Sequence, residues 1–516
     1  MTVKGELTSN NDSVISAENT GANSGLVIED TAVINNNDGI LDIRNSGQRG
    51  SVIAGEINNA LSPDSVVQIT NSNGLLNLYA DIKNGDSAGA LNEVSIINNG
   101  SGFTISGGVI DNYGTLHIEN NGGETNLNGA INAYLGSTTE FIHGTDSDLH
   151  IGMQLENRGN TITIENSGTG SMYIDEGANL SVYSVNEGGQ NYEGVLNLVN
   201  SSTSAAPVPG ITVDGTINNG SASQSGGTVN IIANGQGVTI NEGASINNYG
   251  QTNITNQNSA NAQGSIIVNG SINGGSTGSI NINNEAQGST NGIQFGSTAD
   301  LNLGNNSLIV SNSGQSGIDF ANGSNINSSG RIEITNNSGS LDINSGASVS
   351  TSSDVEIENN ADFNADGSLH GGNVSITNNN GNVNIAHNTT EGNITADNNV
   401  SVIVTNGDIL NHSNSETMIE NGQGITAGGN LNLSADNIGT IDSSVDNILS
   451  DGFNLDSQNS INVSAGGKIS ATAQDNLNIH SYDSNLDFSS VNADNAIIST
   501  DRGNIFADNI NAQDNL

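Results

Sequence analysis

The chain has 516 residues, and its 53 acidic residues against 8 basic ones give a net charge of -45 at pH 7. Binding to nucleic acid or to an anionic membrane surface depends on Lys and Arg, so this charge argues against both partners. The sequence has no Cys, which excludes disulfides, thiol catalysis and Cys-ligated metals. Hydrophobic residues are 33% of the chain and Trp is absent, so a conventional globular core of this size would be under-filled.

The N-terminus, residues 1–14, lacks the apolar segment and the small-residue cleavage site of a signal peptide. Since no window approaches the roughly 20 apolar residues of a membrane span, we expect no direct membrane insertion. The chain ends at residues 514–516, within an unfinished repeat. A cytosolic protein is one interpretation, but an excised piece of a longer secreted chain accounts better for this end.

A short phrase recurs through most of the chain: two apolar residues separated by one, a polar step, and then Asn followed by Asn, Ser or Gly. Clear copies begin at Leu41, Val67, Val94, Leu116, Ile162, Ile280, Ile332 and Val374. With weaker copies, the phrases lie about 26 residues apart on average. A period of this length is typical of a solenoid, in which stacking buries the apolar face of each repeat.

Residues 328–349 show the plan of one repeat. Three apolar alternations occur there, at Ile332 with Ile334, at Leu341 with Ile343, and at the beginning of a third at Val349. Alternation over a few residues predicts a strand with one buried face, and Gly, Asn, Ser and Asp between the alternations predict turns. The sequence therefore predicts an all-β, right-handed, single-stranded parallel β-helix of about 20 coils with three short strands each, in which equivalent Asn residues form hydrogen-bonded ladders.

The phrase degenerates near residue 139, where two His and two Asp occur within eight residues: His143, Asp146, Asp148 and His150. Imidazole nitrogen and carboxylate oxygen are ligands for divalent ions, so these four residues are a candidate metal site. The alternative is an eroded turn whose polar residues face water. We expect no tightly bound cofactor, although the acidic surface could hold Ca²⁺ loosely.

The phrases at residues 162, 196 and 229 lie 34 and 33 residues apart, which indicates inserted loops around 165–212. Insertions in solenoids emerge as loops on one face and often carry recognition. Three aromatic residues of this segment, Tyr173, Tyr183 and Tyr192, are therefore candidate ligand-binding residues, the alternative being that the insertions are neutral decoration.

After about residue 425 the phrase changes type. We interpret residues 1–424 as an Asn-rich parallel β-helix with the inserted loops, and residues 425–516 as the same helix with shorter repeats. The run at 464–473, Ser-Ala-Gly-Gly-Lys-Ile-Ser-Ala-Thr-Ala, and the step Asp-Asn-Leu-Asn-Ile at 475–479 resemble the repeats of filamentous haemagglutinin-like exoproteins of Gram-negative bacteria. The longer Asn-rich coils resemble the passenger regions of autotransporter adhesins.

The resemblance implies a secreted protein at the bacterial surface, associated with the outer membrane, that acts in attachment. We therefore expect an adhesin or stalk fragment whose partner is a host or cell-surface glycan or protein. Other hypotheses are a self-associating sheath or fibre subunit, the stalk of a toxin-delivery exoprotein, and a polysaccharide-active β-helix enzyme. The acidic residues are scattered at turns and few basic residues accompany them, so we expect no enzyme.

Overall fold

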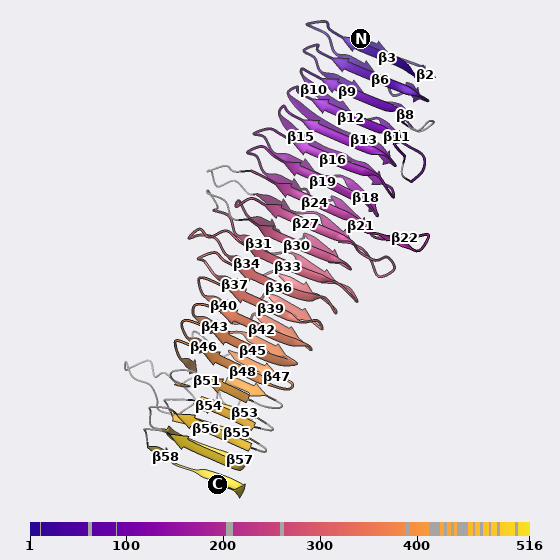
Figure 1. Cartoon of the computed structure of the whole chain (residues 1–516). Coiled ribbons are helices and arrows are strands. Elements are labelled where there is room, and N and C mark those ends of the chain that lie inside the picture. The colour runs from indigo at the N-terminus through magenta and orange to yellow at the C-terminus, as the bar shows by residue number, and fades with distance from the viewer. Residues whose placement is uncertain are drawn as a thin grey trace. The chain divides into compact units, whose positions relative to one another are not determined.

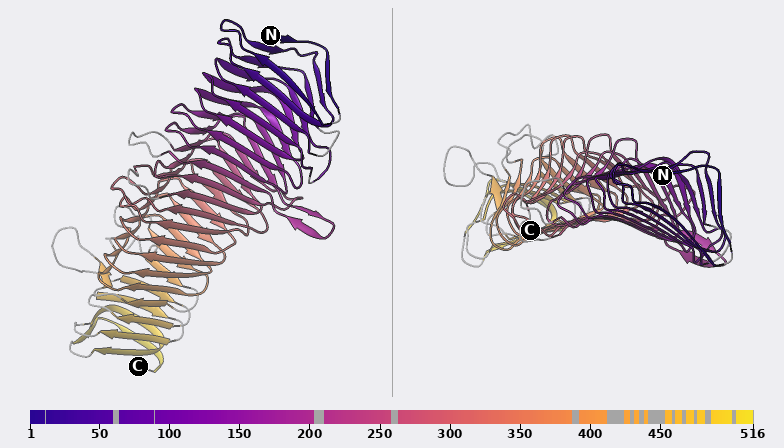
Figure 2. Two further views of the ribbon diagram at one scale, coloured as in Figure 1. Left: turned by 45° about the horizontal axis from the view of Figure 1, so that its top comes forward. Right: turned by 90° about the horizontal axis from the view of Figure 1, so that it is seen from above.

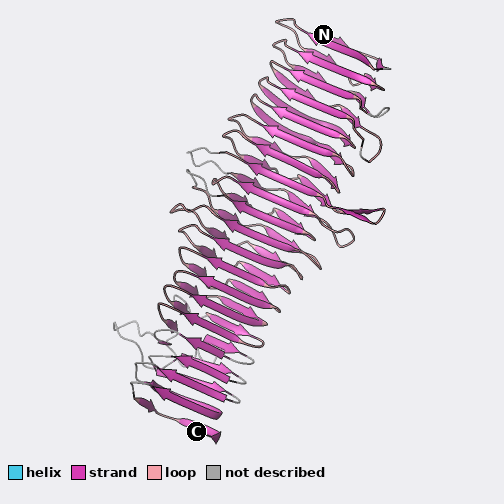
Figure 3. Cartoon of the chain, in the orientation of Figure 1, coloured by secondary structure: helices cyan, strands magenta, loops and turns pink. Residues whose placement is uncertain are grey.

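The computed structural model describes residues 1–411 except 11, 60–63, 89, 203–209, 258–262 and 387–391. Beyond residue 411 it describes 424–427, 431–434, 438–440, 453–457, 460–464, 468–473, 476–481, 486–500 and 504–515. These residues form strands and turns without a helix, and the parallel strands stack as a β-solenoid (Figure 3). No helix in this described part is long and apolar enough to cross a membrane.

Each coil contains three short strands, as predicted. In one coil these are β4 (Leu26–Ile28), β5 (Val33–Asn36) and β6 (Gly39–Asn45). They pair in parallel, in the same order, with β7 (Ser51–Ile53), β8 (Glu56–Asn59) and β9 (Val66–Asn71) of the next coil. We call these the first, second and third strands of a coil. The described residues form a solenoid of about 15 turns, slightly fewer than the 20 or so expected.

The chain divides into two compact units, the first of which comprises residues 1–264 and 275–280. Its third strands lie side by side in Figure 1; besides β6 and β9 they are β3 (Ser13–Asn19), β12 (Glu93–Asn98), β14 (Thr115–Asn120), β16 (Thr138–His143), β19 (Thr161–Asn166), β24 (Val195–Asn200), β27 (Thr228–Ala233) and β30 (Gln251–Asn256). Further first strands are β1 (Thr2–Val3), β10 (Leu75–Leu78), β17 (Leu149–Ile151), β20 (Met172–Ile174), β25 (Ile211–Val213) and β28 (Val238–Ile240). Further second strands are β2 (Glu6–Ser9), β11 (Asp81–Asn84), β18 (Gln154–Arg158), β21 (Asn179–Tyr183), β26 (Thr216–Asn219) and β29 (Ser245–Asn248), whereas β13 (Gly102–Asn112) and β15 (Glu124–Ala133) each span a first and a second strand.

The second unit comprises residues 265–274 and 281–516. Its first strands are β31 (Ile266–Val268), β34 (Ile293–Phe295), β37 (Ile318–Phe320), β40 (Leu341–Ile343), β43 (Phe363–Ala365), β46 (Val383–Ile385), β49 (Ile409–Asn411) and β52 (Ile438–Thr440). Its second strands are β32 (Ser271–Gly274), β35 (Asp300–Asn302), β38 (Asn325–Ser328), β41 (Ser348–Thr351), β44 (Ser368–Gly371), β47 (Asn393–Ala396), β50 (Gly424–Ala427), β53 (Phe453–Ser457) and β55 (Lys468–Ala473). Its third strands include β36 (Ser307–Asn312), β39 (Ile332–Asn336), β42 (Asp354–Asn359), β45 (Asn373–Asn378), β48 (Val400–Val404), β51 (Leu431–Ser434), β54 (Ser460–Ser464) and β56 (Asn476–Ser481).

Parallel pairing continues across residue 424, since β47 pairs with β50 and β48 with β51. The last described strands, β57 (Leu486–Thr500), β58 (Ile505–Ala507) and β59 (Ile510–Asn515), extend the same pairing. This agrees with a continuing solenoid after residue 425, whereas the predicted boundary at 424 stays a prediction.

Stacked aliphatic side chains fill the interior of each unit. The register aligns Leu41 with Val67 and Ile43 with Ile69, and these four residues are at most 2% exposed. Each apolar pair of the repeated phrase thus lies over the pair of the preceding coil. Removing this apolar surface from water drives the stacking, because a single coil has no interior of its own.

Buried Asn residues form the predicted ladders at the ends of the third strands. In the first unit the side-chain Nδ2 of each Asn donates to Oδ1 of the Asn in the next coil, over 2.6–2.8 Å, in the series Asn19, Asn45, Asn71, Asn98 and Asn120. The second unit has the series Asn284, Asn312, Asn336, Asn359 and Asn378, with distances of 2.7–2.9 Å. In both series of this third-strand ladder, the hydrogen bonds satisfy polar groups that would be costly to bury alone.

A second ladder, not predicted from the sequence, lies at the ends of the second strands. It joins Asn36, Asn59, Asn84 and Asn112 over 2.8–3.0 Å, and all four residues are fully buried. The same Nδ2 groups also donate to backbone oxygens of the chain that leads to the third strand, as Asn59 does to Ser65 and Glu93. This ladder fixes the bend between the second and third strands.

Candidate functional site

A β-hairpin leaves the first unit between β21 and β24. Its strands, β22 (Val185–Glu187) and β23 (Gln190–Tyr192), pair antiparallel and form a sheet separate from the solenoid. Gly188 and Gly189 make the turn with φ of 61° and 82°, which Gly adopts without steric cost. The hairpin projects sideways from the coils in both Figure 1 and Figure 2.

The hairpin lies within the range 165–212, where the sequence predicted inserted loops. Residues 203–209 of that range lie outside the described residues. At the hairpin base, Tyr192 packs against Gly159, where an added Cβ would lie 3.0 Å from the Cβ of Tyr192. Gly159 also has φ of 73°, so both space and backbone conformation favour Gly there. The hairpin is therefore anchored against the coil that precedes it.

Three Tyr side chains and one Arg lie in a row at the ends of successive second strands beside the hairpin. This Tyr–Arg column consists of Tyr113, Tyr134, Arg158 and Tyr183. The rings of Tyr113 and Tyr134 are parallel, 4.0 Å apart between centroids with 2° between planes, and the guanidinium carbon of Arg158 lies 5.9 Å from the Tyr134 centroid. Arg158 and Tyr183 are partners in the register of β18 and β21. Such stacking and cation–π contacts each contribute about 0.5–1.5 kcal/mol and hold the column in one arrangement.

The phenol of Tyr134 stays protonated far above neutral pH. Burial and the neighbouring Asp111 carboxylate raise the pKa of Tyr134 to about 12, because both disfavour the phenolate. Its hydroxyl donates to Oδ1 of Asp111 at 3.3 Å, and Nδ2 of Asn132 donates to the same oxygen at 2.8 Å. The phenol of Tyr134 is thus neutral, and the cation of the column, Arg158, is paired with Glu156 at 2.7 Å.

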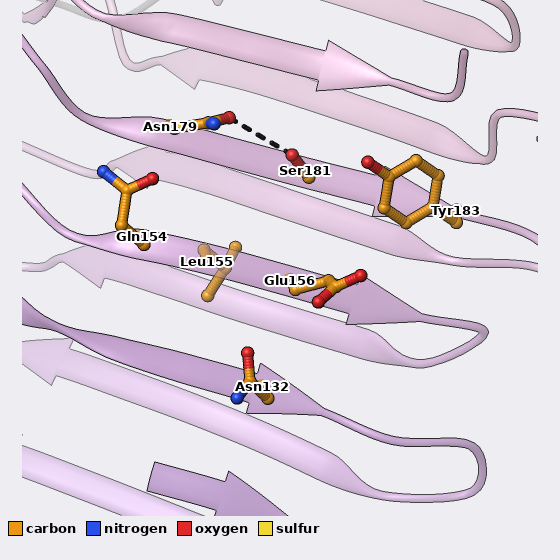
Figure 4. A pocket seen from close by; sticks show the side chains of 7 residues that line it. All are labelled: Asn132, Gln154, Leu155, Glu156, Asn179, Ser181 and Tyr183. Atoms are coloured by element: carbon orange, nitrogen blue, oxygen red, sulfur yellow. Dashed lines mark hydrogen bonds between the residues drawn. The ribbon is translucent and has the colours of Figure 1, made fainter. Parts of the chain in front are cut away.

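A shallow trough of about 300 Å³ lies beside the column on the outer surface of three neighbouring strands, β15, β18 and β21 (Figure 4). It is lined by Asn132, Gln154, Leu155, Glu156, Asn179, Ser181 and Tyr183. In the strand register, Ser181 is the partner of Glu156 on one side and of Asn218 on the other. Because its side chain is shorter than theirs, the surface is hollow at this coil. Figure 4 shows the ring of Tyr183 face-on at one end of the trough, beside Glu156.

Hydrogen bonds hold the polar side chains of the trough. Oγ of Ser181 donates to Oδ1 of Asn179 at 3.2 Å, and Nδ2 of Asn218 donates to the same oxygen at 2.8 Å. Nε2 of Gln154 donates to the carbonyl of Gly177 at 3.1 Å. The trough therefore combines ordered amides, one hydroxyl, one ion-paired carboxylate and an aromatic ring on a rigid sheet.

Two of the three predicted ligand-binding tyrosines adjoin this region. Tyr183 lines the trough, and Tyr192, on the hairpin, donates its hydroxyl to Oε1 of Gln190 at 2.8 Å. Tyr173 lies elsewhere, on the first strand β20, where its ring stacks on His150 with centroids 4.9 Å apart. The structure thus places the three tyrosines on different strands and does not form one cluster from them.

The residues of the predicted metal site point to separate partners. His143 is fully buried in the place of a ladder Asn, with Nδ1 2.8 Å from Oγ1 of Thr125 and Nε2 2.7 Å from the carbonyl oxygen of Ser147. Nδ1 of His150 lies 3.0 Å from Oδ1 of Asp175.

The two aspartates of that cluster accept hydrogen bonds within the turns. Asp146 accepts from the hydroxyl of Thr169 at 2.9 Å, and Asp148 accepts from the backbone N–H of Ser171 at 2.8 Å. Across the described ranges, no group of three or more His, Asp or Glu side chains is arranged to hold a metal ion. This geometry gives the predicted divalent-ion site no support.

A second cavity, of about 410 Å³, is lined by Glu176, Asp214, Glu242 and Gly243. These residues come from the turns after β20, β25 and β28. Asp214 accepts a hydrogen bond from Nδ2 of Asn241 at 2.7 Å. Three of its four lining residues are acidic, which gives the cavity the same sign of charge as the chain as a whole.

No protein-family model, curated protein or solved structure matches the chain. The resemblance to haemagglutinin-like exoproteins therefore stays an expectation drawn from the repeats.

The sequence contains a signal for the Tyr–Arg column that lies outside the repeated phrase. Tyr113 follows Asn112, Tyr134 follows Ala133 and Arg158 follows Asn157, each at the end of a second strand. Because parallel strands in register bring equivalent positions together, residues at this one position of each coil become neighbours. Aligning the coils on their second strands would show these residues at one position.

Proposed function

We propose that the chain is part of a secreted, surface-displayed bacterial adhesin or stalk that recognises a host or cell-surface ligand at the hairpin side of its first unit. The observation that carries the proposal is the projecting hairpin next to an ordered aromatic column and a polar trough. Loops placed on a rigid scaffold are where binding residues concentrate. A stack of parallel strands supplies such a scaffold.

Recognition fits the trough better than catalysis does. Its lining includes one carboxylate, Glu156, which is paired with Arg158, whereas hydrolysis of glycosidic bonds uses two carboxyl groups. In the Tyr–Arg column beside the trough, the raised pKa of Tyr134 keeps its phenol neutral. Stacked aromatic rings and Arg are typical of binding surfaces.

Replacing residues 186–191 by a Gly-Gly link should weaken binding to cells by about tenfold or more, as expected for the loss of central contact residues. The measurement is flow cytometry of fluorescently labelled protein on panels of mammalian epithelial cells and Gram-negative bacteria. The control replaces the exposed loop 221–224, which leaves the next coil at the equivalent place, and it should bind as the unaltered protein does. Equal binding by both variants, or no saturable binding by the unaltered protein to any cell, would refute the proposal.

A further inference from the structure

We infer that the trough binds a neutral, extended, β-linked hexopyranose chain that is held by residues of β15, β18 and β21. This inference rests on the proposed function, because it names the ligand class of the same site. It depends on three features of the trough: the kind of polar groups, the local charge and the extent of the lining.

The polar groups suit sugar hydroxyls. The amides of Asn132, Gln154 and Asn179 each carry both donors and an acceptor, and the hydroxyl of Ser181 can also act as either. A pyranose presents hydroxyls that donate and accept in the same way. Existing hydrogen bonds, such as that from Asn132 to Asp111 at 2.8 Å, hold these amides in place before a ligand arrives. Ordered side chains lose less entropy on binding.

The charge of the site favours a neutral sugar over an acidic one. Arg158, in the column beside the trough, is already paired, since its guanidinium is 2.7 Å from Glu156. Asp111 lies under Asn132, and the whole chain carries a net charge of -45. A uronic acid or sialic acid would have to displace the Glu156 partner and approach two carboxylates. A neutral hexose avoids this repulsion.

Tyr183 supplies the apolar contact. Its ring closes one end of the trough and is seen face-on in Figure 4. The C–H face of a pyranose packs on such a ring, because the face of the aromatic ring carries partial negative charge and the C–H hydrogens of the sugar carry partial positive charge. The hydroxyls of the sugar then point along the surface toward the amides of the neighbouring strands.

The extent of the trough sets the length of the ligand. Neighbouring strands lie about 4.8 Å apart, so the three strands span roughly 10 Å across the stack, and the lining from Asn179 to Tyr183 spans roughly 13 Å along β21. Either length is close to that of two or three pyranose rings joined in an extended chain. A single monosaccharide would contact one or two strands and leave the remaining polar groups to water.

Isothermal titration calorimetry with purified full chain tests the inference. The probes are the hexamers of β-1,4-linked glucose, mannose and N-acetylglucosamine, with β-1,4-linked hexamannuronate as the acidic comparison and glucose as the monomer. We expect at least one neutral hexamer to bind with Kd below about 1 mM, and glucose and hexamannuronate to bind at least about tenfold more weakly. Absence of binding by all three neutral hexamers, or tighter binding of hexamannuronate, would overturn the inference.

Variants localise the site. Tyr183→Ala and the double change Gln154→Ala with Asn179→Ala should each weaken hexamer binding about tenfold or more. Tyr249→Ala is the matched control, because Tyr249 occupies the equivalent position of the second strand two coils further on but does not line the trough. Its binding should be unchanged, and circular dichroism checks that each variant is folded. Unchanged hexamer binding by the two trough variants would contradict the inference. If the unaltered protein binds no hexamer but hairpin replacement still abolishes binding to cells, the inference is wrong and the proposed function is supported.

Discussion

Replacing Asn312 by Ala should destabilise the second unit by about 3–5 kcal/mol, one of the largest effects expected for a single polar side chain. Asn312 is fully buried, donates to Asn336, Gly314 and Ser338, and accepts from Nδ2 of Asn284 and the N–H of Gly314, all at 2.8–3.2 Å. Ala would remove these bonds together and leave buried partners without them. Each such loss costs about 1–3 kcal/mol.

Asn337 provides the control for this change. It is the neighbour of a ladder residue but is exposed, and its side chain makes a long contact of 3.5 Å with Asn360. Asn337→Ala should therefore change the free energy of unfolding by less than about 0.5 kcal/mol. Urea titrations followed by circular dichroism measure both variants. Equal effects of Asn312→Ala and Asn337→Ala would show that the buried ladder does not stabilise the solenoid.

The first unit should lose stability as pH falls below about 6.5 because of His143, which stands in the ladder between Asn120 and Asn166. Burial lowers the pKa of His143, since the imidazolium loses its hydration, and the carbonyl of Ser147 and the charge of Asp148 oppose this only in part. The unfolded chain binds a proton near pH 6.5, whereas the folded chain binds it only at a lower pH. Stability is therefore full above the unfolded pKa and declines as pH falls toward the folded one.

His143→Asn should remove this part of the pH dependence, because Asn restores the residue type of the ladder and does not titrate. Urea unfolding of both proteins at pH 7.5 and pH 5.5 measures the effect. Both pH values lie above the ordinary pKa of carboxyl groups, whose protonation would otherwise add to the dependence of stability on pH. The same loss of stability in both proteins, or a gain in the unaltered protein at pH 5.5, would show that burial does not lower the pKa of this imidazole.

The repeat phrase predicted the fold because it determines which side chains of each coil point into the interior. In Leu41-Asp-Ile43-Arg-Asn45, the alternation places Leu41, Ile43 and Asn45 inside, and the register then repeats this in the next coil. A hydrophobic interior and an Asn ladder both follow from this one pattern. The second ladder, at Asn36 and its equivalents, was missed because its Asn residues follow a single apolar residue and give a weaker signal.

The residues of the candidate metal site have separate partners for a reason that the strand pattern explains. His143 ends a strand with its side chain inward, where it replaces a ladder Asn, whereas Asp146 and Asp148 lie in the turn that follows. The two His and two Asp are close in sequence, but alternation and turning of the chain direct side chains to different places. Short spacing in the sequence therefore does not by itself bring the four side chains together.

The Tyr–Arg column could not be recognised from local sequence. Tyr134, Arg158 and Tyr183 are one coil apart in the chain, and they become neighbours only through the register of the second strands. Coil lengths vary along the chain, so this register was not evident without aligning each second strand. The stretched interval did predict an insertion, but the antiparallel pairing of β22 and β23 depends on Gly188 and Gly189 at its turn.

Hydrogen–deuterium exchange with and without the tightest-binding neutral hexamer tests most directly whether the hairpin side of the first unit is the recognition surface. We expect slower exchange on ligand addition in peptides that cover 130–134, 154–158 and 179–192, and unchanged exchange in the second unit. Protection confined to other coils, or no protection at saturating ligand, would contradict the assignment of recognition to the trough and the hairpin.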